Sequence, residues 1–333
     1  MFDLITTKAL DNCRAAGDDI FSTHDDISDC SLYEKFASFE PVPVQALVTD
    51  RNGIVDAQKM KFQALQNIHT NQVLDVLPFN PDSYGLEPHH TLMNDQANRL
   101  KVSGLRDKLG NVEVIDRIYE QGLRVHRTIH FHDLVHTTRT RTGQEDVTRC
   151  RMDIFNSVDK TWTFQVFSGA YRDLCRNTLV FGGEKAYHQK MKHTKNIATG
   201  AIIEKGIMGI SMWDGQKDVM DMYREQRMTE KQFNDVLIDS GMIDKVGKVA
   251  ANNDELKVNQ RKLATLLDLY GKETRELGET MWAAFNALTH WSTHLPDANK
   301  GGRDEKKRLD KSIAVRDLVQ SDAWLNHAGM AVA

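Results

Sequence analysis

Residues 122–151 read GLRVHRTIHFHDLVHTTRTRTGQEDVTRCR, and the alternation in the first half of this stretch decides the fold class. Successive residues of a β-strand point to opposite sides, so an alternating pattern separates apolar and polar side chains onto two faces. The apolar face holds Val125, Ile129, Phe131 and Val135, and the polar face holds His126, Thr128, His130, His132 and His136. We therefore expect a strand with one face in the core and the other face open to solvent or a ligand.

The neighbouring segments predict further strands and short turns. Strands are expected at 112–119, 122–137, 147–155 and 161–168, with turns at 142–143 and 157–160. Earlier in the chain, a strand at 42–50 precedes Asn52-Gly53, a dipeptide typical of β-hairpin turns. The middle of the chain is therefore predicted to form an antiparallel sheet.

Helical spacing marks the segments on both sides of this sheet. Leu92, Gln96 and Leu100 recur at four-residue steps and predict an amphipathic helix. Cations spaced three and four residues apart after Gly182-Gly183 predict a basic helix over 184–195. From about residue 217 the pattern is helical almost throughout, apart from a charged loop expected at 296–311.

These patterns predict an α+β protein in three parts. Residues 1–40 form an acidic N-terminal arm, and residues 41–212 form a β-rich core domain with the antiparallel sheet and the basic helix. Residues 213–333 form a helical C-terminal lobe, in which Thr229 and Gln232 fit a capping box.

Composition limits the classes of function. The 333 residues carry a net charge of −4, so any binding to nucleic acid must come from a local basic patch. The four cysteines are far apart and form no C-x-x-C pair, which argues against a zinc site or a disulfide framework. The chain begins without a signal-peptide pattern and has no apolar window of membrane-span length. We expect a cytoplasmic protein that does not enter a membrane.

The local basic patch is predicted in the arginine-rich strands and the basic helix after them. Arginine is the side chain best suited to bidentate contact with phosphate, and acidic residues are few in these segments. The candidate nucleic-acid-binding residues are Arg124, Arg127, His130, His132, Arg139, Arg141, Arg149, Arg151, Arg172, Arg176, Lys190, Lys192, His193 and Lys195. If His126, His130, His132 and His136 face phosphate, binding should strengthen as the pH falls through about 6 to 7. The alternative is an ordinary solvated sheet face.

His130 and His132 are also the best candidates for a metal site. Strand residues two apart point the same way, with Cα atoms roughly 6.5–7 Å apart, which is close enough to chelate one ion. His136 is too far along the strand, and no acidic residue in phase supplies a third ligand. No nucleophile or cofactor motif such as G-x-S-x-G, H-E-x-x-H or G-x-G-x-x-G occurs, so no catalytic residue and no cofactor is expected.

The aromatic residues of the predicted hairpin have two interpretations. Five aromatic residues could stack nucleic-acid bases or pack in the core: Phe155, Trp162, Phe164, Phe167 and Tyr171. Core packing is the more common use of aromatic residues in a hairpin, and we predict it for Trp162 and Phe164.

Three segments carry a resemblance to a known family: RMDIFNSVDKTWTFQVFSGAYRDLCRNTLVFGG at 151–183, MKHTKN at 191–196 and TMWAAFNALTHWSTH at 280–294. In this order they resemble the DUF932 family, a domain of unknown function carried by phages and plasmids. The positions that match the family's motifs are Arg172, Cys175, Asn177, His193, Thr194, Asn286, Ala287, Thr289 and His294. The resemblance implies a phage or mobile-element protein in a bacterial cytoplasm, without an established reaction. A curved antiparallel sheet followed by a basic helix is also similar to Rad52-type single-strand annealing proteins.

The functional hypothesis is a phage-type protein that binds single-stranded DNA or RNA and anneals strands during recombination. Annealing requires a surface that holds one backbone and leaves the base edges exposed. Proteins of this kind act as rings or filaments, so a homo-oligomer is expected. The alternatives are a metal-dependent hydrolase or nuclease that uses His130 and His132, and a structural or host-interaction phage protein.

Overall fold

The computed structural model describes residues 20–24, 39–49, 55–69, 71, 80, 82–180, 188–195, 197–243, 253–294 and 302–330. The described strands are β1 (Ile20–His24), β2 (Phe39–Thr49), β3 (Val55–Asn67), β4 (Val112–Tyr119), β5 (Arg124–Arg139), β6 (Glu145–Ser157), β7 (Phe164–Arg172), β8 (Asn177–Val180) and β9 (His188–Met191). The helices are α3 (His89–Val102), α4 (Arg106–Leu109), α5 (Thr199–Ser211), α6 (Trp213–Glu225), α7 (Glu230–Asp239), α8 (Asn253–Leu277), α9 (Met281–Thr293), α10 (Gly302–Val319) and α11 (Asp322–His327), and the short 3-10 helix η1 (Glu120–Gly122) precedes β5.

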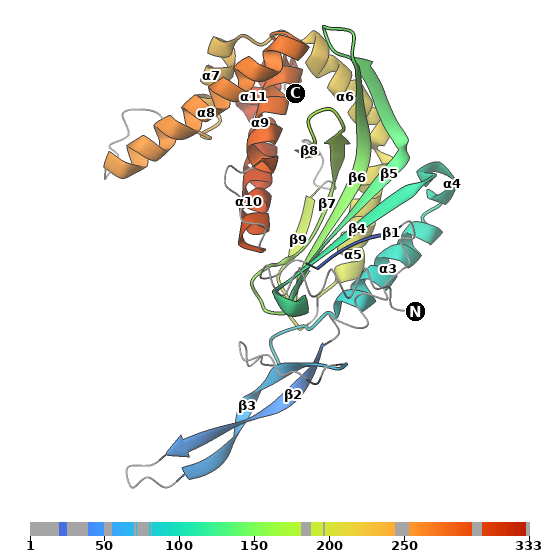
Figure 1. Cartoon of the computed structure of the whole chain (residues 1–333), viewed down its shortest axis with the longest axis vertical. Helices are drawn as coiled ribbons and strands as arrows, with labels where there is room; N and C mark the ends of the chain where they lie inside the picture. Colours follow the sequence, from blue (N-terminus) through green and yellow to red (C-terminus); the bar gives the residue numbers. More distant parts are fainter. Residues whose placement is uncertain are drawn as a thin grey trace.

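A curved antiparallel sheet forms the centre of the molecule (Figure 1). Its described strands follow the order β1-β4-β5-β6-β7-β8, and β9 pairs with β7. Strands β2 and β3 form a separate two-stranded hairpin that extends away from the sheet (Figure 1). These findings confirm the α+β fold with its antiparallel sheet and helical C-terminal part.

The convex face of the sheet packs against helices. Val125, Ile129 and Phe131 of β5 are completely buried there, together with Leu92 of α3 and Ile203 of α5. α5 crosses the sheet closely at Gly206, where an added Cβ atom would lie 2.4 Å from Cγ1 of Val166. A residue without a side chain is needed at that crossing.

The concave face carries a second, smaller aromatic cluster beneath α10. Leu309 of α10 packs there against four aromatic residues on or next to the strands: Tyr119, Phe155, Trp162 and Phe167. Trp162 is 4% exposed. Phe164 is fully buried in the main core, so the prediction that Trp162 and Phe164 are core residues is confirmed.

Several elements predicted from the sequence are present. Leu92, Gln96 and Leu100 are all buried on α3. Thr229 and Gln232 form the expected capping box at the start of α7. β2 and β3 pair in an antiparallel hairpin, with Thr49 opposite Val55, whereas the Asn52-Gly53 turn itself lies outside the described residues.

Two predicted elements are wrong. The basic helix expected over 184–195 is strand β9 at His188–Met191, because its backbone pairs with the open edge of β7 and this pairing outweighs the helical spacing of the lysines. The loop expected at 296–311 is helical from Gly302, as the start of α10. Residues 181–187, which include Gly182-Gly183, lie outside the described residues, as does most of the predicted acidic arm.

The predicted boundary between a core domain and a helical lobe stays a prediction. One buried cluster includes sheet residues such as Ile129 and C-terminal residues such as Phe285 and Trp324. None of the described helices is both long enough and apolar enough to cross a membrane.

Candidate functional site

The concave face of the sheet is polar at its centre, as the alternation in β5 predicts. Residues directly opposite each other on antiparallel strands share a face. Thr128 lies opposite Asp153, and His130 lies opposite Arg151. A β-bulge between Phe131 and Val135 then changes the phase, so that Val135 lies opposite Arg149. The prediction that Val135 shares the apolar face of β5 is therefore wrong.

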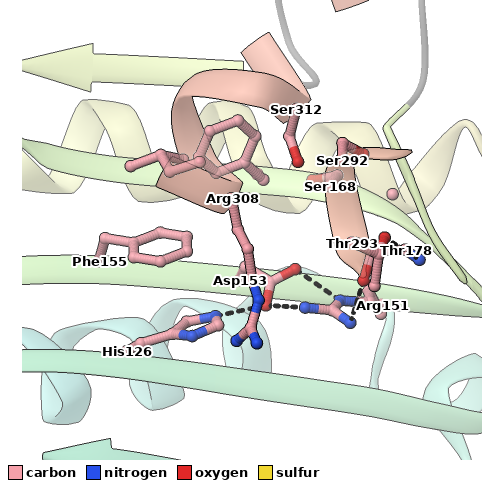
Figure 2. A pocket seen from close by; sticks show the side chains of 13 residues that line it. His126, Arg151, Asp153, Phe155, Ser168, Thr178, Ser292, Thr293, Arg308 and Ser312 are labelled. Carbon is pink, nitrogen blue, oxygen red and sulfur yellow. Dashed lines mark hydrogen bonds and ion pairs between the residues drawn. The ribbon is translucent and has the colours of Figure 1, made fainter. Parts of the chain in front are cut away.

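Asp153 of β6 is the centre of the polar network on this face. His126 Nε2 lies 2.7 Å from its Oδ1, Thr128 Oγ1 donates to the same oxygen at 2.9 Å, and Arg151 Nε donates to Oδ2 at 2.6 Å. Figure 2 shows His126, Asp153 and Arg151 meeting beneath α10. Burial opposes the charge on Asp153, but Arg151 and His126 outweigh it and hold the pKa of this carboxyl well below its usual range.

The two histidines of the metal hypothesis have different surroundings. His130 is buried, and its ring meets that of Tyr171 edge-on at 5.2 Å. Burial and the nearby Arg151 lower the pKa of His130 to about 3, so the imidazole is neutral near pH 7. The side chain of His132 is 39% exposed, with Nε2 3.9 Å from a carboxylate oxygen of Glu113. Among the described residues, no three His, Cys, Asp or Glu side chains are placed to share a metal ion.

Two of the predicted phosphate-binding arginines are completely buried. Arg127 Nε and Nη2 donate to the two carboxylate oxygens of Asp116 at 2.8 and 2.9 Å. Arg172 Nε donates to Asp146 at 2.7 Å. Neither side chain faces solvent, so neither contacts a phosphate on the surface of this fold, and the prediction that all the arginines line one surface is wrong for both.

Three further candidate arginines lie in ion pairs within the sheet. Arg124 Nε donates to Asp159 at 2.7 Å, and Arg151 is 9% exposed and pairs with Asp153. Arg149 pairs with Asp173 at 2.9 Å, with its side chain 28% exposed. The expectation of few acidic neighbours is therefore wrong, because the fold brings Asp159 and Asp173 from more distant positions, and Asp153 lies two residues from Arg151 on the same strand face.

The exposed candidate cations form two groups at opposite ends of the sheet. Arg139, Arg141 and Arg176 lie on or beside the β5–β6 and β7–β8 turns, and Lys190, Lys192 and Lys195 lie on or after β9. β9 pairs with β7 near Phe164, whereas the β7–β8 turn follows Arg172, eight residues or about 26 Å further along. His193 is buried beside Tyr84, and burial lowers its pKa to about 4. The expected gain in binding as the pH falls through 6 to 7 cannot come from His130, whose pKa is about 3.

One end of the concave face is left open by α10. We define the open part of the concave face as His132, Arg139, Arg149 and Tyr171, together with Arg141 and Arg176 from the adjoining turns. Val135, Arg149 and Tyr171 lie side by side on β5, β6 and β7. This part of the face combines arginines with one partly exposed aromatic ring.

Five of the residues that match the family's motifs come together at the junction of the sheet with α8 and α9: Arg172, Cys175, Asn177, Asn286 and His294. His193 lies instead beside Tyr84, near β9. We call Asp146, Arg172, Arg224, Glu273 and Asn286 the junction cluster. Arg172 Nη1 donates to Asn286 Oδ1 at 3.2 Å and to Glu273 Oε2 at 3.3 Å, and Arg224 Nη2 donates to Asp146 Oδ2 at 2.9 Å. Burial opposes the charge on Asp146, but hydrogen bonds from both arginines lower the pKa of this carboxyl. These motif residues therefore tie the helices to the sheet.

Three further motif residues, Asn177, His294 and Cys175, extend this junction. Asn177 Nδ2 donates to the backbone oxygen of Asn286 at 3.2 Å, and His294 Nε2 lies 3.1 Å from Asn177 Oδ1. Burial raises the pKa of Cys175 to about 11, so its thiol is protonated near pH 7 and is a poor nucleophile.

Sequence reasoning missed several residues of the junction cluster. Asp146, Arg224 and Glu273 are charged side chains in a buried junction, and no local pattern in the sequence indicates that β6, α6 and α8 meet there.

Comparison with known families identifies this chain. Residues 105–314 match the family model described as Domain of unknown function (DUF932). The match covers more than half of the chain, so the protein belongs to this family, as the order of its motifs predicts. No curated protein and no solved structure matches the chain.

Proposed function

We propose that the protein binds single-stranded nucleic acid at the open part of the concave face, through the phosphate backbone. The observation that supports this function is the set of exposed or partly exposed arginines at one end of the sheet, where Arg149 lies directly opposite Tyr171. Arg139 and Arg141 come from the β5–β6 hairpin, Arg149 comes from β6, and Arg176 comes from the β7–β8 turn.

The charges of these arginines are accessible to a ligand. Arg139, Arg141 and Arg176 are exposed, and within the described part of the chain none of them lies within ion-pair distance of a carboxylate. Arg149 is paired with Asp173, but both side chains are partly exposed, and such a pair contributes little to stability. Phosphate can therefore compete with Asp173 for this guanidinium.

Tyr171 gives a reason for preferring a single strand. Its ring is partly exposed between Arg149 and the turn that carries Arg176. A single strand presents unstacked base faces to an aromatic ring, whereas a duplex keeps its bases stacked inside. A strand held by its phosphates beside Tyr171 would leave its base edges exposed, as annealing requires.

The biological setting follows from the family resemblance. We place this binding in phage DNA metabolism in the cytoplasm of a bacterial host, with annealing of complementary strands during recombination as the use. Annealing proteins act as assemblies, so the proposal includes a homo-oligomer on the strand. A strand-annealing assay with two complementary oligonucleotides, one of them quenched on pairing, measures this activity directly.

The binding surface is tested by a matched pair of triple variants. Fluorescence anisotropy with a labelled single-stranded oligonucleotide at low salt compares R139A/R141A/R176A with R227A/K231A/K272A, which removes three exposed cations elsewhere. Loss of three charge-assisted contacts should weaken binding by about tenfold or more in the first variant and leave the second near wild type. Equal losses in the two variants, or no loss in the first, would refute the assignment of the surface.

A further inference from the structure

The hairpin of β2 and β3, which we call the arm, extends away from the rest of the chain (Figure 1). Its base is anchored, because Ala64 and Leu65 near the end of β3 are 6% and 2% exposed and Leu65 belongs to the main core. Beyond this base, β2 and β3 pair only with each other among the described strands. An isolated two-stranded hairpin is at best marginally stable in water, so the arm needs a surface to pack against.

The composition of the arm indicates what kind of surface it needs. β2 reads FEPVPVQALVT, and its residues 41–48 include no charged residue. Removing apolar surface from water is favourable by about 25 cal/mol for each Å². The surface that receives the arm is therefore expected to be apolar.

The edges of the arm are poorly suited to pairing with a further strand. β2 carries Pro41 and Pro43, which have no backbone N–H to donate. β3 carries Lys59 and Lys61, and the register of the two strands shifts between Pro43 and Gln45. Prolines, lysines and register irregularities are features by which edge strands avoid pairing. The arm is therefore suited to docking by a face and not to extending a sheet.

An open groove with exposed apolar side chains lies between α3 and α5. Val102 of α3 and Met208 of α5 line it, and these residues are 82% and 54% exposed. The groove has a volume of about 360 Å³. One water occupies about 10–15 Å³ of such a volume, so the groove has room for several side chains. Large apolar side chains that are exposed together mark a surface for protein interaction.

This groove is formed but uncovered in its own chain. Arg99 of α3 pairs with Glu204 of α5, so an ion pair joins its two walls. The arm of the same chain extends away from α3 and α5 (Figure 1), and Val102 and Met208 stay exposed. An arm that fills the groove therefore comes from another molecule.

We propose that the arm of one copy of this chain docks in the groove between α3 and α5 of a second copy. The arm supplies an uncharged strand segment that needs an apolar surface, and the groove supplies apolar side chains that need a cover. Because arm and groove are different surfaces of one chain, the contact is head to tail, and its repetition gives a ring or a filament. This contact rests on the homo-oligomer of the proposed function, but it does not use the arginines of the open part of the concave face.

The groove is tested by sedimentation velocity without nucleic acid, so the result does not depend on strand binding. M208E places a charge in the apolar groove, whereas K205E changes an exposed residue of the same helix that does not line the groove. We expect the wild type and K205E to associate, and M208E to associate at least about tenfold more weakly. V102E, on the other wall, provides a second groove variant, and far-UV circular dichroism checks that each variant is folded.

The arm is tested by replacing residues 45–59 with two glycines, which keeps the pairing of Val42 with Ala64 at the base. This shortened variant should be a monomer, as M208E should be. M208E keeps an intact arm and the shortened variant keeps an intact groove, so an equal mixture of the two should form a dimer.

Three results would overturn the proposal. A mixture that stays monomeric would show that arms pair with arms or grooves with grooves. Association of M208E and V102E as strong as that of the wild type would exclude the groove, and a wild type that is monomeric at about 100 μM would exclude the interface. A protein that associates as expected but does not bind a single strand would refute the proposed function and leave this interface in place.

Discussion

Arg172 of the junction cluster and Arg176 of the open part of the concave face lie four residues apart at the end of β7, yet they have opposite environments. Arg172 is fully buried, with Asp146, Glu273 and Asn286 around it. Arg176, four residues later, is exposed. A dense run of arginines therefore does not identify a binding surface. Strand phase and distant carboxylates decide which arginines hold the fold and which can meet a ligand.

The largest loss of stability is expected from removing Arg172 of the junction cluster. R172A leaves Asp146 and Glu273 in a buried site without their main cation, which should cost about 3–5 kcal/mol of unfolding free energy. Urea unfolding measures this loss. R141A, which removes an exposed arginine on a turn, is the control and should stay within about 0.5 kcal/mol of wild type. Similar losses in the two variants would remove the distinction between the regions.

A second effect of burial should appear as a dependence of stability on pH. His89 Nε2 lies 2.9 Å from the Gly122 carbonyl oxygen and Asn156 Nδ2 lies 2.8 Å from His89 Nδ1, which fits the neutral tautomer with hydrogen on Nε2. Burial lowers the pKa of His89 to about 4, below its ordinary value of 6.5. As the pH falls, His89 takes up a proton in the unfolded chain before it does so in the folded protein. The stability that neutral His89 gives the folded state is therefore complete above pH 6.5 and is lost as the pH falls towards 4.

The pH effect is measurable by unfolding at fixed temperature. His89 alone should lower the unfolding free energy by about 2 kcal/mol between pH 7.5 and pH 5. H89Q, which keeps a polar side chain but does not titrate, should reduce this slope. An unchanged slope in H89Q would show that other groups cause the acid sensitivity.

The pair of Arg149 and Asp173 lies at the border between the junction cluster and the open part of the concave face. Breaking this pair should change stability less than removing Arg172. Its side chains are 28% and 36% exposed, so D173A should change stability by less than about 1 kcal/mol. Removing this carboxylate leaves Arg149 available to phosphate, so D173A should strengthen single-strand binding a few-fold, and R149A should weaken it. Anisotropy at one salt concentration measures both, and weaker binding by D173A would show that Arg149 acts only in the fold.

The sequence predicted the strands of the sheet better than the roles of its side chains. Alternation in β5 depends on residues two apart, and it correctly placed Val125, Ile129 and Phe131 in the core. It failed at Val135 because a bulge is set by pairing with β6, which no local pattern reports.

The ion pairs could not be predicted because their partners are distant in sequence. Arg172 and Glu273 are 101 residues apart, and Arg172 and Asn286 are 114 residues apart. The family motifs indicated that Arg172, Asn177 and Asn286 belong together, but not that they form a buried junction. Likewise, β9 was predicted as a helix from its lysine spacing, because pairing with β7 is a tertiary contact.

The most direct test of the account is the salt dependence of binding to a single-stranded oligonucleotide compared with a duplex of the same sequence. Binding by the four arginines of the open part predicts that the logarithm of the single-strand affinity falls linearly with the logarithm of salt concentration, with a slope of about −2 to −3. It also predicts weaker binding to the duplex, because Tyr171 meets no unstacked base there. No binding to the single strand at low salt, or an affinity that does not change with salt, would contradict the account.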